Sequence, residues 1–116
     1  MKVFHRDGKP HLLWGFHELA WSFRTEGVEY PIWDAQGKEI GSIRSQKRAG
    51  SIELPEGAKY LLERYFSNKG YPHHALYRLP ELEIIAKFDR DTDLDDIQVL
   101  NVPEPIKDFL MRDLYE

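Results

Sequence analysis

Carboxylates concentrated in one short segment are the most distinctive chemical feature of this sequence. Residues 89–96 read DRDTDLDD, and their five aspartates and one arginine give a net charge of −4, which equals the formal net charge of the whole 116-residue chain. Like charges in such a cluster repel one another and add nothing to a core. This acidic segment, residues 89–96, is therefore either a solvated loop or a surface that binds a cationic partner.

Alternating aspartates can also bind a divalent cation, as in calcium loops that supply oxygens at positions 1, 3 and 5, a glycine at 6 and a glutamate at 12. Asp89, Asp91 and Asp93 match the first three positions. Leu94 stands where the glycine is required, and Leu100 stands where the glutamate is required. We therefore predict no specific metal site in this segment.

Histidines are the next candidates, since imidazole is the side chain whose free pKa suits proton transfer at neutral pH. His17 begins a sequence like the zinc protease motif, but Trp21 occupies the position of the second histidine ligand. His5 and His11 flank an expected two-residue turn, whose register directs them to opposite faces of the hairpin. Neither arrangement predicts a metal site.

His73 and His74 are adjacent and follow the end of a predicted helix, so we expect them on a loop, where functional residues often collect. Neighbouring side chains diverge in extended backbone, and one metal would rarely bind both. A role in acid–base catalysis needs a carboxylate partner, which the sequence does not place. We expect a loop that packs or is solvated, and we assign no catalytic residue.

Residues 44–50, RSQKRAG, form a basic counterpart to the acidic segment. Arg44, Lys47 and Arg48 place three positive charges within five residues that contain no acidic residue. This basic loop is either a solvated turn or a flexible contact for phosphates, with nearby aromatic rings for base stacking. The acidic balance of the whole chain makes nucleic-acid binding the weaker interpretation.

Length and composition indicate an ordinary globular protein. Hydrophobic residues make up 41% of the chain and charged residues 31%, far from the composition of disordered proteins. We predict a single globular domain over residues 1–116. The absence of cysteine excludes disulfides, cysteine zinc sites and thiol nucleophiles.

Nucleotide-binding and hydrolase motifs are also missing. The sequence contains no Walker loop, no G-x-G-x-x-G and no G-x-S-x-G, so we predict no cofactor. It starts without an apolar signal region and contains no apolar run long enough to span a membrane. We therefore expect a cytoplasmic protein without membrane contact.

The first half of the chain predicts mainly strands. Asp7 and Gly8 form a hairpin turn, and Pro10 should keep the second strand short or at a sheet edge. Residues 15–26 fit either a helix or a strand; we favour a helix that ends at Gly27. Strands are then expected over 28–32, 40–43 and 51–54, with a turn at 34–37 and a possible bulge at Gly41.

The second half predicts two helices and two strands. After Pro55, the apolar residues 58, 61, 62 and 65 repeat at helical spacing, which is the clearest helical pattern in the chain. It ends at residues 67–70. Strands over 82–88 and 97–102 would make the acidic segment a hairpin loop, and Pro105 begins a helix with apolar residues at 106, 109, 110 and 114. These elements predict an α+β domain, in which a mainly antiparallel sheet of four to six strands is covered by two or three helices.

These features favour a small soluble protein-binding module of the inhibitor, immunity or adaptor type over an enzyme. The predicted docking residues are Asp89, Asp91, Asp93, Asp95, Asp96, Arg44, Lys47 and Arg48. Aspartates in this pattern could pair with lysines or arginines that normally hold phosphate, and so block a nucleic-acid-handling partner. The alternatives are a small hydrolase or nuclease-like enzyme that uses His73 or His74 with carboxylates, and a weak RNA-contacting module that uses the basic loop.

Overall fold

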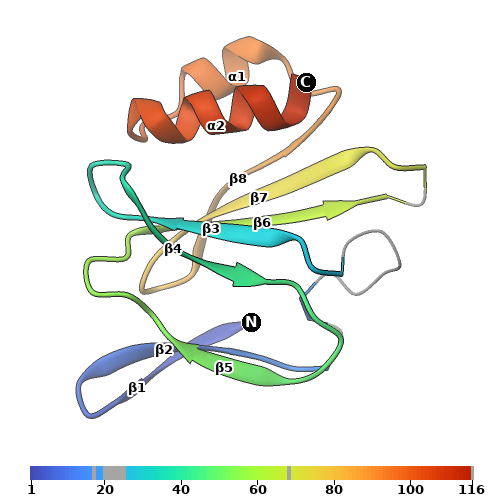
Figure 1. Ribbon diagram of the computed structural model, residues 1–116. Helices are drawn as coiled ribbons and strands as arrows, with labels where there is room; N and C mark the ends of the chain where they lie inside the picture. The colour runs from blue at the N-terminus through green and yellow to red at the C-terminus, as the bar shows by residue number, and fades with distance from the viewer. Residues whose placement is uncertain (17, 20–25, 68, 116) are drawn as a thin grey trace.

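Eight strands and then two helices make up the part of the chain that the structure describes (Figure 1). The structure is a computed structural model and covers residues 1–16, 18–19, 26–67 and 69–115. The strands are β1 (Lys2–Arg6), β2 (Lys9–Trp14), β3 (Glu29–Trp33), β4 (Glu39–Arg44), β5 (Gly50–Glu53), β6 (Tyr60–Phe66), β7 (Pro72–Arg78) and β8 (Glu83–Asp89). The helices are α1 (Leu94–Gln98) and α2 (Glu104–Tyr115).

The strands are divided between two antiparallel sheets. One sheet has the order β1-β2-β5, and the other has the order β4-β3-β6-β7-β8. Figure 1 shows the two helices above the five-stranded sheet and the three-stranded sheet below it, so that the larger sheet is the middle of three layers. The predicted α+β class with mainly antiparallel pairing is confirmed, with two helices in the described residues and with two sheets instead of one.

Two hydrophobic cores fill the spaces between these layers. The core between the two sheets includes Leu12, Tyr30, Ile32, Ile43 and Leu61. The core between the five-stranded sheet and the helices includes Trp33, Leu62, Leu76, Ile106 and Leu110. The central strands of the five-stranded sheet are therefore buried on both faces.

Strand β6 occupies the segment that carries the clearest helical pattern, so the prediction of a helix after Pro55 is wrong. Leu61 packs in the core between the sheets, and its neighbour Leu62 packs in the core under the helices. A strand buried on both faces has apolar residues at consecutive positions, and such a run can match helical spacing by chance. Pro55 instead begins a turn, in which its carbonyl oxygen accepts a hydrogen bond from the backbone N–H of Ala58 at 3.1 Å.

The acidic segment joins a strand to a helix and is not a hairpin loop. Strand β8 is confirmed, but the extended run predicted over 97–102 is wrong because residues 94–98 form α1. Ile97 is fully buried in the core under the helices. Asp95 and Asp96 lie in the first turn of α1, where negative charge is favourable beside the unpaired N–H groups of a helix.

The N-terminal hairpin is confirmed, with Asp7 and Gly8 both at positive φ in its turn. The expectation that Pro10 makes its strand short or peripheral is wrong, since β2 lies in the middle of the three-stranded sheet. Pro10 is tolerated because it sits at the end of the β2–β5 ladder, where its carbonyl oxygen accepts a hydrogen bond from the N–H of Leu54 at 2.9 Å.

The strands predicted over 28–32, 40–43 and 51–54 are confirmed as β3, β4 and β5. The helix predicted from Pro105 is confirmed as α2. The register between β3 and β4 shifts so that Ile40 is an extra residue next to Gly41, where a bulge is expected. Residues 17 and 20–25 lie outside the described residues, so the helix favoured over 15–26 stays a prediction. Gly27 has a φ of 84°, the left-handed conformation expected of it.

Candidate functional site

The acidic segment is held at its start by hydrogen bonds between its own residues. Asp89 is the last residue of β8, and its backbone N–H donates to Oγ1 of Thr92 at 2.9 Å. Its Oδ1 accepts a hydrogen bond from the backbone N–H of Asp91 at 2.8 Å. Asp89 is half-buried and fixes the start of the segment, whereas Asp91, Asp93, Asp95 and Asp96 are exposed.

The exposed aspartates are poorly neutralised by this protein's own cations. Arg90 lies in their midst, but its guanidinium stacks over the ring of Tyr71 at 3.5 Å and its Nε is 3.9 Å from Asp91. Within the described ranges, no cationic side chain forms an ion pair with Asp93, Asp95 or Asp96. The segment therefore keeps most of its negative charge for solvent or for a partner.

Apolar side chains are exposed next to these aspartates. Leu94, the first residue of α1, is 45% exposed, and Val99, which follows that helix, is 79% exposed. Tyr71, under the guanidinium of Arg90, is 37% exposed. The surface around α1 thus combines exposed carboxylates with exposed apolar groups.

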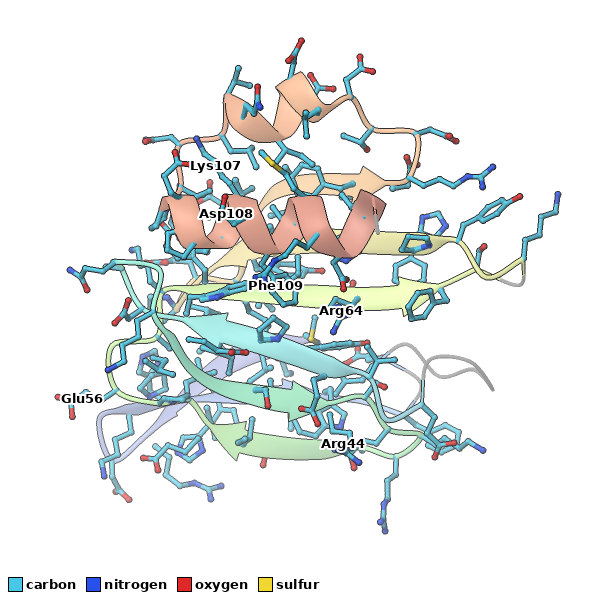
Figure 2. The ribbon with its side chains drawn as sticks, turned by 45° about the horizontal axis from the view of Figure 1, so that its top comes forward. Arg44, Glu56, Arg64, Lys107, Asp108 and Phe109 are labelled. Atoms are coloured by element: carbon cyan, nitrogen blue, oxygen red, sulfur yellow. The ribbon has the colours of Figure 1, made fainter. Side chains whose placement is uncertain are left out.

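The basic loop lies apart from the acidic segment and is largely neutralised. Arg44 forms an ion pair with Glu29 at 3.0 Å, and Lys47 forms one with Glu26 at 3.4 Å. The carbonyl oxygen of Arg48 accepts a hydrogen bond from Nε1 of Trp14 at 2.9 Å. Figure 2 places Arg44 on the side of the three-stranded sheet, away from the helices. The eight predicted docking residues therefore belong to two separate surfaces.

The two adjacent histidines lie in strand β7, so the prediction that they sit on a loop is wrong. Their side chains diverge to opposite faces of the sheet, as expected for neighbours in extended backbone. His74 is buried beneath α2, with its side chain 1% exposed, and its Nε2 lies 2.6 Å from Oδ2 of Asp113. The sequence could not indicate this pair, because the two residues are far apart in the chain and Asp113 resembles any polar residue on a helix.

Arg64 completes a partly buried polar cluster with His74 and Asp113. Its Nε and Nη2 donate to the two carboxylate oxygens of Asp113 at 2.9 and 2.7 Å, and its Nη1 donates to the carbonyl oxygen of Glu29 at 2.9 Å. Its guanidinium also lies 5.5 Å from the ring of Phe109 (Figure 2). Burial raises the pKa of Asp113, but the hydrogen bond with His74 and the charge of Arg64 outweigh it, so that this pKa is lowered. The cluster ties α2 to the sheet.

His73 lies on the opposite face of the same sheet, where a pocket of about 270 Å³ opens. Its ring stacks on the ring of Tyr65, with centroids 4.9 Å apart and planes 10° from parallel. The side chains that carry chemistry around this pocket are Glu63, Tyr65, His73, Tyr77, Lys87 and Asp89. Of these, the residues that were not selected from the sequence are Glu63, Tyr65, Tyr77 and Lys87. Because the segment of β6 was predicted as a helix, the alternation that places Glu63 and Tyr65 on one face of a strand was not recognised.

Burial perturbs the acid–base groups at one end of this pocket. It raises the pKa of Glu63, although the N-terminal ammonium, the hydroxyl of Tyr77 and the charge of Lys87 act in the opposite direction. Burial and the nearby Glu63 raise the pKa of Tyr77 to about 12. Perturbed groups that converge on one pocket are typical of functional sites, although structural clusters share this property.

Among the residues that the structure describes, no group of three or more His, Asp or Glu side chains is arranged to hold a metal ion. No helix in that part of the chain is long and apolar enough to cross a membrane.

Comparison of the chain with protein-family models, with curated proteins and with solved structures finds no match in any of the three.

Proposed function

We propose that this protein is a protein-binding module of the inhibitor, immunity or adaptor type, which docks through the acidic segment onto a basic surface of its partner. The observation that carries the proposal is the group of exposed carboxylates with few cationic partners of their own, next to exposed Leu94 and Val99. Complementary charge would steer the encounter and fix its orientation, while the apolar groups would supply contact area.

The partner that suits this surface presents lysines and arginines around an apolar centre. Proteins that handle nucleic acids have such surfaces, because their cationic side chains hold phosphates. Aspartates spaced along the turn and the first turn of α1 would occupy those cationic groups in place of phosphates. The expected consequence for such a partner is loss of nucleic-acid binding while this protein is bound.

Replacing Asp91, Asp93, Asp95 and Asp96 with asparagine is expected to slow association with the partner at least about tenfold at low salt, because electrostatic steering is lost. The partner is first captured from a host extract at low salt and purified, and association rate constants are then measured across a salt series. The wild-type rate should fall steeply with salt and approach the rate of the variant.

The matched control removes four other exposed carboxylates and so changes the net charge equally. It replaces Asp7, Glu39, Glu56 and Glu81 with the corresponding amides. Figure 2 shows Glu56 far from the helices. This control should keep most of the wild-type rate. If both variants slow association equally, or if neither does, docking through the acidic segment is wrong.

A second candidate function is a small hydrolase or nuclease-like enzyme, which is favoured by the pocket that joins His73 to Glu63 and Asp89. A raised pKa on Glu63 and an imidazole nearby suit general acid–base catalysis. Cleavage of an RNA oligonucleotide that is lost in both His73→Ala and Glu63→Gln would support it. The absence of cleavage by the wild-type protein would remove it.

A further inference from the structure

We propose that the pocket over β6, β7 and β8 receives an arginine side chain of the partner, and that this arginine anchors the complex. The proposal rests on the proposed function, because it identifies what the partner inserts beside the acidic segment. It also assigns to the pocket a ligand of stated chemistry, a guanidinium group.

The shape of the pocket follows from the strand register. Ala75 lies in the middle of β7, paired with Glu63 on β6 and with Lys87 on β8. His73 and Tyr77 stand two residues away from it on the same face of β7. A small side chain surrounded by large ones leaves a hollow, and its floor is apolar while its walls are polar or aromatic. These dimensions admit one side chain rather than an extended substrate.

Two carboxylates stand on opposite sides of this hollow. Glu63 comes from β6, and Asp89 comes from β8, next to the stacked rings of Tyr65 and His73. Carboxylates accept hydrogen bonds from the planar fork of a guanidinium, and aromatic faces attract its delocalised charge. An arginine head group is therefore the ligand that matches both kinds of wall.

The same chain already binds its own guanidinium groups in this way. Arg64 is held by both oxygens of Asp113 and lies over the ring of Phe109, on the other face of the sheet. Arg90 lies over the ring of Tyr71. These two sites, one between β6 and α2 and the other just before β7, show that carboxylates and rings of this protein are arranged at distances that suit guanidinium groups.

Lys87 is the cation that an arginine ligand would replace. It is exposed on the edge strand β8, and its charge acts on Glu63 across Ala75. If the pocket binds arginine, Lys87 competes with the ligand. If the pocket instead binds a phosphate, as the enzyme alternative requires, Lys87 and His73 are the groups that would hold it. The two interpretations therefore predict opposite effects of removing Lys87.

Asp89 connects the pocket to the proposed docking surface. It lines the pocket and is also the first residue of the acidic segment. The pocket opens on the face of the sheet away from α1 and α2, so a partner that inserts an arginine there and also contacts the exposed aspartates would reach around the edge strand β8 where Asp89 ends it. Central pockets that take an arginine, surrounded by weaker contacts, are a common form of energetic hot spot in protein interfaces.

The test is a titration of the full chain with N-acetyl-arginine methylamide at pH 8, a pH chosen to favour the ionised form of Glu63, because burial raises the pKa of this carboxyl group. Binding is followed by the NMR signals of the rings of Tyr65, Tyr77 and His73. We expect a saturable shift of these signals, weaker binding by about tenfold in Glu63→Gln, and tighter binding in Lys87→Met. Lys87→Met keeps the apolar stem on an exposed strand edge, so it should fold normally.

Two controls separate the pocket from general electrostatics. Glu56→Gln removes an exposed carboxylate outside this pocket and should leave the arginine affinity unchanged within about twofold. N-acetyl-lysine methylamide should bind more weakly than the arginine probe, because a point charge cannot use both carboxylates and the rings. Equal effects of Glu56→Gln and Glu63→Gln would overturn the proposal.

Titration with inorganic phosphate and with uridine monophosphate tests whether the pocket binds an anion instead of a guanidinium group. Shifts with either anion that disappear in Lys87→Met, without shifts by arginine, would overturn the arginine site in favour of an anion site. The asparagine variant of the four exposed aspartates should still bind the arginine probe. Failure of the probe to bind overturns only the pocket, whereas unchanged partner association in that variant overturns only the proposed docking surface.

Discussion

Replacing Asp113 with alanine is expected to lower the free energy of unfolding by about 3 kcal/mol. The substitution leaves His74 and Arg64 without the carboxylate that they share, on side chains that are 1% and 18% exposed. Removing one partner of a buried charged cluster costs more than the net contribution of the cluster, because the remaining groups stay desolvated. We expect the lower end of the usual range, since Asp113 itself is 25% exposed.

Urea unfolding of the wild-type protein and the variant measures this loss. Asp108→Ala is the matched control, because Asp108 is an exposed aspartate on the same helix (Figure 2). It should change the free energy of unfolding by no more than about 0.5 kcal/mol. Comparable losses in the two variants would mean that the cluster does not tie α2 to the sheet.

The pH dependence identifies the carboxylate as the source of the effect. The pKa of Asp113 is lowered in the folded protein, so its ionised form stabilises the fold above the pKa of an unfolded aspartate, near 4. This contribution is lost as the pH falls through the lowered pKa. The stability difference between the wild type and Asp113→Asn should therefore be present at neutral pH and shrink below about pH 4. A difference that grows on acidification would contradict this account.

The elements that could be predicted from the sequence are those whose signals are local. The turn at Asp7 and Gly8 carries its own backbone preference, and Pro105 with the apolar residues after it defines one face of α2. Strand β6 and helix α1 could not be predicted in this way. The first is buried on both faces, and the second is a single turn whose helical form depends on packing of Ile97.

The two candidate sites, the acidic segment and the pocket, also differ in whether a local sequence signal predicts them. Charge composition alone locates the acidic segment, because exposed carboxylates need no knowledge of the fold. The pocket depends on three neighbouring strands and on the register that pairs Glu63, Ala75 and Lys87. Because β6 was predicted as a helix, neither the pocket nor the contact between Arg64 and Asp113 could be predicted.

Alanine substitutions in β6 distinguish a strand from the helix that its sequence favours. Leu61 and Leu62 are both fully buried, in two different cores. Leu61→Ala and Leu62→Ala should each lower the free energy of unfolding by about 3 kcal/mol, through lost burial and the cavity left behind. Chemical denaturation of the two single variants and the double variant measures these losses.

The informative comparison is with Tyr65, which a helix would place on the same buried face as Leu61 and Leu62. In the strand, its side chain lies at the pocket and is 40% exposed, with its ring stacked on His73. Tyr65→Ala should therefore cost only about 1 kcal/mol, the range for a partly exposed aromatic pair. Because the two leucines belong to opposite faces, their losses should add within about 0.5 kcal/mol. A loss at Tyr65 as large as at Leu61, with strong coupling between the leucines, would require one shared core and would contradict the strand.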